Sequence, residues 1–225
     1  MTLRLAVFDM DGVLIPAIGS WALLHRAFGT TNHDNLEAFT RGEIDDSEFI
    51  RRDIGKWLTA RGKIHHDEVV RVLEKIAHDP AAVDVFRMLR EAGVRTAIIS
   101  GGLEPLVSRI GRILSADHVH YNSLEVDAHG FLTGHGKVGV PLRRKSEIVA
   151  MLRRQCGAER EEVIAFGDTE FDVSMFDEAG IGVAVDPKDE TIRRAASVIF
   201  PGLSQAVPFV DSLLTGARRV KRRNT

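Results

Sequence analysis

Five short runs of mostly apolar residues constrain the fold of this 225-residue chain more than any other feature. They lie at residues 5–8, 94–99, 163–166, 181–185 and 198–200. Runs without polar alternation are typical of strands that are buried on both faces of a sheet. Helical patterns separate them, as where Asp79-Pro80 begins a helix that Gly93 ends. The alternation predicts an α/β fold with a Rossmann-like parallel sheet between helical layers.

Two segments interrupt this alternation. Residues 15–78 contain several helical stretches and no convincing strand, so we expect a helical cap of residues 15–78 inserted into an α/β catalytic core of residues 1–14 and 79–225. Aromatic side chains at helical spacing should form the cap core: Trp21, Phe28, Phe39, Phe49 and Trp57. The second segment has strand-like stretches on both sides of residues 127–130, which predicts a small β-hairpin insert.

Composition limits the classes of partner. The chain is 44% hydrophobic and 28% charged, as in ordinary soluble globular proteins, and its net charge of -2 argues against general nucleic-acid binding. Basic residues crowd the C-terminus, where they form either a solvated end or a weak contact for RNA or anionic lipid: Arg218, Arg219, Lys221, Arg222 and Arg223. Cys156 is the single cysteine and no long apolar run occurs, so we expect a cytoplasmic protein without a membrane partner.

Polar residues gather where the predicted strands end. The groups concerned are Asp9 and Asp11 after the first strand, Ser100-Gly101-Gly102 after the second, Asp168 and Asp172 after the third, and Lys145 at the start of the preceding helix. Ligands of open parallel sheets bind beyond the carboxyl ends of the strands. We therefore expect these groups to share one site.

Several carboxylates in one site require a cation. Two unit charges about 4 Å apart repel by roughly 4 kcal/mol at an effective dielectric constant of 20. The predicted metal residues are Asp9, Asp11, Asp168 and Asp172. All of these donors are oxygens, with no Cys or His in the motifs, and this favours Mg²⁺ over zinc.

A metal ion beside an aspartate indicates phosphoryl transfer. In this hypothesis Asp9 attacks phosphorus, and Asp11 protonates the leaving alkoxide and later activates water. The Ser100 hydroxyl, the Lys145 ammonium and backbone N–H groups of Gly101 and its neighbour, at the start of the following helix, hold the phosphoryl oxygens.

Other motifs carry less weight. Residues 134–139 match the spacing of a dinucleotide-binding loop, but Pro141 follows where a helix should continue. The histidines lack a convincing ligand spacing and are interpreted as solvated surface residues: His65, His66, His118, His120, His129 and His135.

Four segments, in their order along the chain, resemble the motifs of haloacid dehalogenase superfamily phosphatases. They are Asp9-Met10-Asp11-Gly12-Val13, Ile99-Ser100-Gly101-Gly102, Lys145 and Gly167-Asp168-Thr169-Glu170-Phe171-Asp172. The Ser-Gly-Gly form, the cap position and the hairpin resemble the phosphoserine phosphatase-like subgroup. The resemblance implies that the Asp9 and Asp168 carboxylates and the Asp11 carbonyl bind magnesium, with Asp172 acting through water or Lys145.

The substrate-reading positions differ from that subgroup. It has an acidic residue for the serine amine where this chain has Pro16-Ala17-Ile18, and a cap arginine for the serine carboxylate where this chain has Asp53. Phe171 stands in place of an asparagine, and Arg51 and Arg52, beside Asp53, are the candidate cap contacts. Three hypotheses about the function follow from these residues.

The first hypothesis is a Mg²⁺-dependent phosphomonoester hydrolase that acts through an aspartyl-phosphate on a small phosphorylated metabolite, with a phosphoserine-like substrate as the leading candidate. The second keeps the chemistry but uses a sugar or alcohol phosphate, or transfers the phosphoryl group to another metabolite. The third is a catalytically weak binding protein that uses the basic tail.

Overall fold

A seven-stranded sheet forms the centre of the described molecule, in the strand order β4-β3-β2-β1-β5-β6-β7. The computed structural model describes residues 2–15 and 19–223, with side chains up to residue 216. Its strands are β1 (Leu5–Phe8), β2 (Arg95–Leu103), β3 (His118–Val126), β4 (Leu132–Lys137), β5 (Val163–Gly167), β6 (Ile181–Val185) and β7 (Val198–Phe200). Every neighbouring pair is parallel except β3 and β4. The predicted α/β fold is confirmed.

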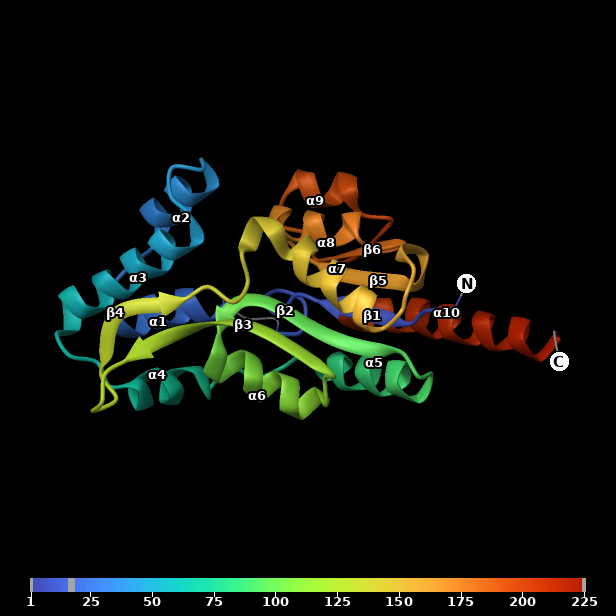
Figure 1. Ribbon diagram of the computed structural model, residues 1–225, viewed down its shortest axis with the longest axis horizontal. Helices are drawn as coiled ribbons and strands as arrows, with labels where there is room; N and C mark the ends of the chain where they lie inside the picture. The colour runs from blue at the N-terminus through green and yellow to red at the C-terminus, as the bar shows by residue number, and fades with distance from the viewer. Residues whose placement is uncertain (1, 16–18, 224–225) are drawn as a thin grey trace.

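Helices cover both faces of the sheet (Figure 1). One layer contains α5 (Pro80–Glu91), α6 (Glu104–Leu114) and α10 (Leu203–Arg223), and the other contains α7 (Lys145–Gln155), α8 (Val173–Asp177) and α9 (Glu190–Ala195). Side chains of β1 alternate between the layers, so that Ala6 and Phe8 join the first and Leu5 and Val7 join the second. All four are fully buried, which explains the unbroken apolar run in the sequence.

The predicted helix after residue 79 forms for the reasons that its sequence suggests. The Asp79 carboxylate accepts a hydrogen bond of 2.8 Å from the Ala81 N–H, and Pro80 occupies the first helical position. Its inner face brings Phe86 to 4.7 Å from Phe8, measured between ring centroids. The helix is thereby fixed under the strand that leads into the site.

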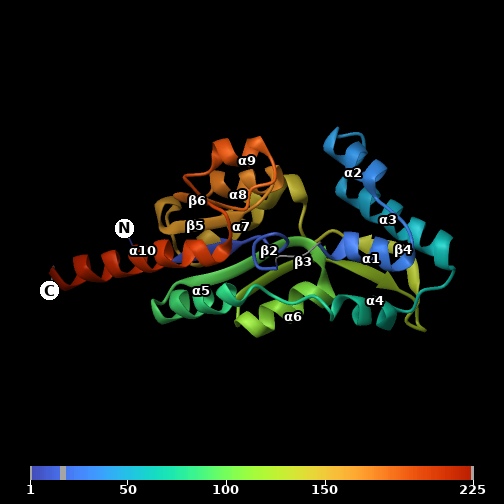
Figure 2. The same ribbon diagram turned by 180° about the vertical axis from the view of Figure 1, so that it is seen from behind.

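Residues 20–73 form four helices, which we call the helical segment: α1 (Ser20–Phe28), α2 (His33–Thr40), α3 (Asp46–Arg61) and α4 (His66–Leu73). Its aromatic residues pack together as predicted, with Trp57 lying 5.4 Å from Trp21 and 5.8 Å from Phe28, and Phe39 lying 5.3 Å from Phe49. Figures 1 and 2 show α1 and α3 at the end of the molecule opposite the C-terminus. That residues 15–78 form a separate cap domain stays a prediction.

The predicted hairpin is present and also extends the sheet. The first half of β3 pairs in parallel with β2, whereas its second half pairs with β4 in antiparallel register. Gly130, with φ of +81°, makes the turn. A Cβ atom at Gly136 would lie 2.6 Å from Ile50 Cγ2, so the glycines of β4 allow α3 to pack closely against the hairpin. The dinucleotide-like spacing at residues 134–139 thus belongs to a packed strand.

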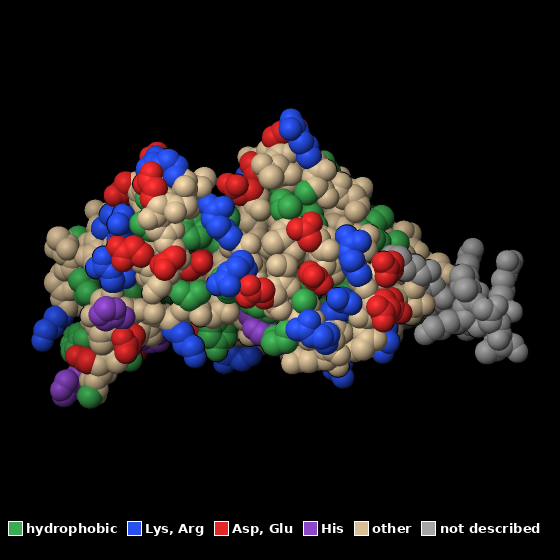
Figure 3. All heavy atoms as spheres, turned by 45° about the horizontal axis from the view of Figure 1, so that its top comes forward, with side chains coloured by type: hydrophobic (Ala, Val, Ile, Leu, Met, Phe, Trp, Pro, Cys, Tyr) green, Lys and Arg blue, Asp and Glu red, His purple; other side chains and the backbone are tan. Residues whose placement is uncertain are grey.

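The described surface carries both signs of charge. On the face in Figure 3, the Lys and Arg side chains are interleaved with Asp and Glu, as the balanced composition suggests. None of the described helices is long and apolar enough to cross a membrane. The side chains of the basic C-terminal residues, from Arg218 on, lie outside the described residues, as does the segment Pro16-Ala17-Ile18.

Candidate active site

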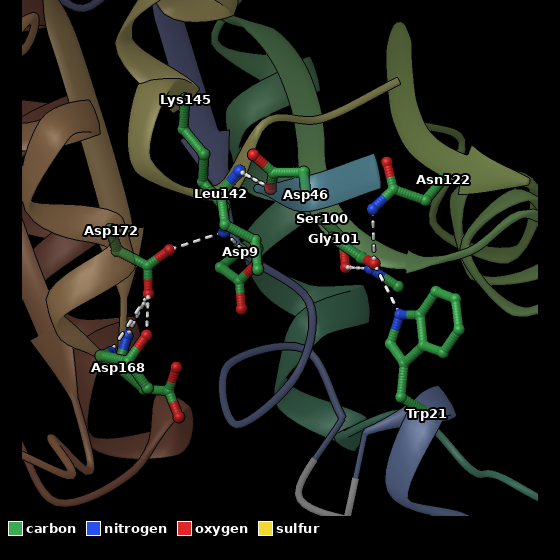
Figure 4. Close-up of polar contacts among 12 residues, drawn as sticks. Asp9, Trp21, Asp46, Ser100, Gly101, Asn122, Leu142, Lys145, Asp168 and Asp172 are labelled. Carbon is green, nitrogen blue, oxygen red and sulfur yellow. Dashed lines mark hydrogen bonds and ion pairs between the residues drawn. The ribbon is translucent and has the colours of Figure 1, made fainter. Parts of the chain in front are cut away.

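A cavity of about 600 Å³ opens at the carboxyl ends of β1, β2 and β5. From the sheet side it is lined by Asp9, Asp11, Ser100, Gly101, Lys145 and Asp168, and from the helical segment by Trp21, Ala22, Asn32, Leu36, Asp46, Phe49 and Ile50. The polar residues that the sequence assigned to strand ends therefore meet in one place. Asp172 is fully buried, does not line the cavity, and contacts the end of the Lys145 side chain (Figure 4).

The turn after β1 carries the two aspartates. The Asp9 N–H donates to the Phe166 carbonyl at 2.9 Å and prolongs the pairing of β1 with β5. The chain then turns through Gly12, whose φ is +76°. A Cβ atom at Gly12 would lie 2.0 Å from Asp168 Oδ2, so only glycine lets this turn come close to Asp168.

Lys145 joins two carboxylates beneath the cavity. Its Nζ atom lies 2.7 Å from Asp9 Oδ1 and 2.7 Å from Asp172 Oδ1, and the lysine is 2% exposed. Burial alone would lower the pKa of this amine, but the charges of Asp172 and Asp9 outweigh it and hold the pKa above its ordinary value. Lys145 is therefore a permanent cation that fixes the orientation of Asp9.

Asp172 holds both Lys145 and the loop after β5. Its Oδ2 atom accepts hydrogen bonds from the backbone N–H groups of Asp168 and Thr169, at 3.0 and 3.1 Å. Because its Oδ1 atom receives the Lys145 ammonium, both oxygens of Asp172 are engaged. Asp172 thus acts on the site through its neighbours.

The carboxylates near Lys145 form a group of oxygen donors that suits a hard divalent cation. Oxygen atoms of Asp9, Asp168 and Asp172 lie within 4.8 Å of one another. Burial raises the pKa of Asp9 to about 6, although the Lys145 charge opposes the shift. Burial, together with the charges of Asp9 and Asp172, raises the pKa of Asp168 to about 9. A donor set of oxygens alone fits magnesium. Asp9 and Asp168 are free to coordinate it directly.

Asp11 stands beside this cluster, against the start of α1. Burial raises its pKa to about 7, and the Asp9 charge adds to the shift. Its Oδ1 atom is buried without a hydrogen-bond partner among the described residues. A Cβ atom at Gly19 would lie 2.2 Å from Asp11 Oδ2, so a glycine at that position gives the carboxyl group its room. A carboxyl group with this pKa can donate a proton near neutral pH.

The predicted phosphate-binding segment lies in the last residues of strand β2, whereas the sequence placed it after the strand. Ser100, Gly101 and Gly102 belong to β2, and α6 begins at Glu104 with Leu103 as its N-cap, so a helix start follows them as predicted. Regular pairing with β3 is interrupted between Ile99 and Leu103. The Ser100 hydroxyl accepts the Gly102 N–H at 2.9 Å and lies at the cavity with Gly101.

Comparison with known proteins agrees with this arrangement. The model of the family described as haloacid dehalogenase-like hydrolase matches residues 6–177. The chain belongs to this family. Its parallel sheet and buried carboxylates agree with membership of this hydrolase family, and the relatives that it matches are phosphatases.

Relatives of this hydrolase include several phosphoserine phosphatases. Phosphoserine phosphatase SerB2 of Mycobacterium tuberculosis is 31% identical over 216 residues, which cover 95% of this chain and 50% of the relative. Phosphoserine phosphatase of Lactococcus lactis is 30% identical over 214 residues, which cover 93% and 96%. The chain thus spans about half the length of some relatives, as it also does for the one from Archaeoglobus fulgidus, of which 53% is covered.

Solved structures share the fold. The unliganded probable phosphoserine phosphatase from Vibrio cholerae has a TM-score of 0.79 at 25% identity, over 97% of this chain and 67% of that one. A structure described as a phospho-aspartyl intermediate analogue of phosphoserine phosphatase also has a TM-score of 0.79, at 22% identity, over 93% and 99%. The seven-stranded sheet is therefore the fold of this hydrolase family.

The structure does not bring Arg51 and Arg52 of this hydrolase to the cavity, which corrects the predicted substrate contacts. Both side chains are exposed on the outer face of α3, and each donates to the Glu48 carboxylate at 2.7 Å. They border a separate surface depression of about 940 Å³. Helical geometry explains the error, because Ile50, Asp53 and Ile54 face inward and leave positions 51 and 52 on the outer face.

Asp53, which aligns with the family's cap arginine, is also absent from the cavity surface. It is fully buried and accepts hydrogen bonds from Asn32 at 3.2 Å and from Asn35 at 2.6 Å. Its Oδ2 atom lies 3.1 Å from His25 Nε2. Asp53 is therefore the centre of a polar network inside the helical segment.

Contacts between the helical segment and the sheet domain involve residues that the sequence did not single out. The Asp46 carboxylate accepts the Leu142 N–H at 2.8 Å (Figure 4). Arg143 donates to the carbonyls of Phe39 and Thr40, at 2.9 and 2.7 Å, and its guanidinium lies 5.8 Å from the Phe171 ring centroid. The sequence offered no periodic signal for these pairs, because they join segments about 100 residues apart.

A second set of such contacts fixes Gly101 in strand β2. The Gly101 carbonyl accepts both the Trp21 indole N–H at 2.9 Å and the Asn122 amide at 3.0 Å. Asn122 in turn accepts the N–H groups of Gly139 and Val140, each at 2.9 Å. Trp21 and Asn122 thus position Gly101 from opposite elements, α1 and β3.

Proposed function

We propose that this protein is a Mg²⁺-dependent phosphomonoester hydrolase that forms a covalent phosphoryl intermediate on Asp9. The observation that carries the proposal is the bond of 2.7 Å from Lys145 to one oxygen of Asp9, at the floor of a cavity that Asp11 also lines. One carboxylate oxygen is held by a permanent cation, and the other is left to act as the nucleophile.

The residues divide the chemistry between two steps. In the first, an Asp9 oxygen forms a bond to phosphorus as the ester bond breaks, and Asp11 gives its proton to the departing alkoxide. In the second, Asp11 takes a proton from water as that water attacks the phosphoryl group on Asp9. A pKa of about 7 supports both roles, because Asp11 can exist in either protonation state near neutral pH.

Phosphoryl oxygens need compensating positive charge and donors. The Ser100 hydroxyl and the Lys145 ammonium border the cavity and can provide them, with Gly101 allowing a close approach. Asp9 and Asp168 would hold the magnesium ion, as would the Asp11 carbonyl by the family resemblance, with Asp172 acting through Lys145 or water. Bound magnesium supplies positive charge to the phosphoryl oxygens.

The cavity fits a small phosphorylated metabolite. Ligand sites of small molecules usually measure about 300–1,000 Å³, and this one measures about 600 Å³. The names of the relatives make phosphoserine the first substrate to test. The same residues would serve a sugar or alcohol phosphate, or transfer to an acceptor alcohol in place of water. A complete set of catalytic groups favours an enzyme over a binding protein that uses the basic tail.

The test is release of inorganic phosphate from p-nitrophenyl phosphate and a panel of metabolite phosphates, with magnesium and with EDTA. We expect Asp9→Asn to lower turnover by about 10³-fold or more, since it removes the nucleophile. Its thermal unfolding midpoint should stay within a few degrees of the wild type. Asp45→Asn, on an exposed helix cap, is the matched control. Unchanged turnover in Asp9→Asn would refute the assigned nucleophile.

A further inference from the structure

The wall of the cavity that faces a departing alcohol is mostly apolar. It comes from α1, α2 and α3, and its apolar members are Trp21, Ala22, Leu36, Phe49 and Ile50. Two polar residues also line this wall: Asp46, from α3, and Asn32, which precedes α2. The Asn32 amide donates to Asp53. The chemistry of the leaving group must match this wall, because the phosphoryl group is held on the opposite side by the sheet residues.

No cation of the described residues lies on that wall. The cavity has two lysines, and Lys145 is occupied by Asp9 and Asp172. Lys188 follows β6, pairs with Asp186, and donates its backbone N–H to the Asp168 carbonyl, so it belongs to the metal side of the cavity. The segment Pro16-Ala17-Ile18, outside the described residues, has no charged side chain in its sequence.

Nearby arginines are directed elsewhere. Arg51 and Arg52 pair with Glu48 on the outer face of α3. Arg143 donates to the carbonyls of Phe39 and Thr40 and is not among the residues that line the cavity. A carboxylate on the leaving group would therefore lose water without gaining a cation in exchange, which is costly.

Asp46 gives the wall its one formal charge. It is the first residue of α3, and its Oδ1 atom accepts the Leu142 N–H at 2.8 Å. This bond holds the carboxylate at the junction of the helical segment and the sheet domain (Figure 4). An ammonium group on the leaving group could pair with Asp46, and the aromatic faces of Trp21 and Phe49 also favour a cation.

We propose that the substrate is the phosphomonoester of an amino alcohol, with an ammonium group and no carboxylate on the leaving group. The proposal rests on the proposed function and narrows it to one class of substrate. This substrate class differs from the phosphorylated amino acid that the names of the relatives suggest. A carboxylate near Asp46 would meet a like charge, and like charges in an enclosed site disfavour the wrong partner strongly.

Three probes isolate the charges of the leaving group. O-phosphoserine differs from O-phosphoethanolamine only by its carboxylate, and n-propyl phosphate replaces the ammonium with a methyl group. With magnesium, we expect kcat/KM for O-phosphoethanolamine to exceed each of the other two by at least about tenfold, as for gain or loss of one charged contact. Hydrolysis of p-nitrophenyl phosphate by the same preparation reports on the phosphatase chemistry itself.

Two matched variants test the role of Asp46. Asp46→Asn keeps an oxygen for the Leu142 N–H and removes the charge, so we expect the preference for O-phosphoethanolamine over n-propyl phosphate to fall about tenfold. Asp45→Asn makes the same change one residue earlier, at an exposed position outside the cavity, and should leave that preference unaltered.

The outcomes are distinct. A wild-type protein that hydrolyses p-nitrophenyl phosphate but prefers O-phosphoserine overturns the substrate class and leaves the proposed function standing. A preference for n-propyl phosphate, or an Asp46→Asn variant with the wild-type preference, removes the role given to Asp46. A protein that hydrolyses none of the four esters overturns the proposed function and the substrate class with it.

Discussion

Replacing Lys145 by methionine removes a positive charge at the base of the candidate site while keeping most of the side-chain volume. The ammonium lies 2.7 Å from an oxygen of Asp9 and 2.7 Å from one of Asp172. At that separation one pair of unit charges attracts by about 6 kcal/mol at an effective dielectric constant of 20. Desolvation of the buried ions offsets much of this, and breaking a buried pair usually costs about 3–5 kcal/mol. We expect Lys145→Met to lower the free energy of unfolding by about that amount.

A double-mutant cycle separates the ion pair from packing. Asp172→Asn removes one buried carboxylate and keeps an oxygen that can accept the N–H groups of Asp168 and Thr169. Because each single change leaves a buried group without its partner, the double variant should be more stable than the sum predicts, by about 2 kcal/mol or more. Urea unfolding, followed by circular dichroism at pH 8 in EDTA, measures all four proteins. Turnover of p-nitrophenyl phosphate should be low in every variant.

Two results would refute this reasoning. A loss below about 1 kcal/mol in Lys145→Met, which is the size of an ordinary surface change, would mean that the two contacts contribute little in solution. A coupling energy near zero would mean that Lys145 and Asp172 do not interact directly. The decrease in the free energy of unfolding of Lys145→Met should also be smaller at pH 5. Asp9, with its raised pKa, can take up a proton once the Lys145 ammonium is removed.

Three further outcomes follow from the same geometry. Gly19→Ala should lower kcat about tenfold or more by crowding Asp11, whereas Gly55→Ala, with no atom within 4 Å of the new methyl group, should not. Arg143→Met should raise KM about fivefold by loosening the contact with Phe39 and Thr40, whereas Arg144→Met, which breaks only a surface pair with Glu147, should leave KM unchanged. In EDTA, the raised pKa values of Asp9, about 6, and Asp168, about 9, mean that their contribution to stability is present below pH 4 and is lost as the pH rises through these values. Magnesium should therefore raise the thermal midpoint more at pH 8 than at pH 5, and equal shifts would contradict the assigned metal site.

The strands that the sequence predicted well are those buried on both faces. Residues 5–8 and 181–185 match β1 and β6, because burial on two sides requires an unbroken apolar run. Residues 198–200 match β7 although Ile199 is exposed. The parallel half of β3 was missed because His118, His120 and Asn122 interrupt its apolar residues. The site explains Asn122, which holds Gly101 and lines the cavity.

The residues of the candidate site could be predicted because a parallel sheet brings together the residues that follow its strands. Asp9 and Asp168 lie at the ends of β1 and β5, which are neighbours in the sheet, so sequence position translates directly into proximity. The contacts of Asp46 with Leu142 and of Arg143 with Phe39 have no such rule, because they depend on how one packed unit lies against another. Sequence reasoning therefore brings the strand-end residues together correctly and fails for contacts between the helical segment and the sheet.

Asp53 shows why the cavity wall from the helical segment can change separately from the aspartates and Lys145. The family resemblance implies an arginine at this position, whereas here the buried Asp53 carboxylate accepts hydrogen bonds from Asn32 and Asn35 and lies 3.1 Å from His25 Nε2. Because Asn32 lines the cavity and donates to Asp53, the residue at position 53 lies one contact behind the wall and supports it. An arginine introduced there would deprive Asn32 and Asn35 of their acceptor before it reached a substrate. A carboxylate-binding site would thus require rebuilding the interior of the helical segment, while the aspartates and Lys145 could remain as they are.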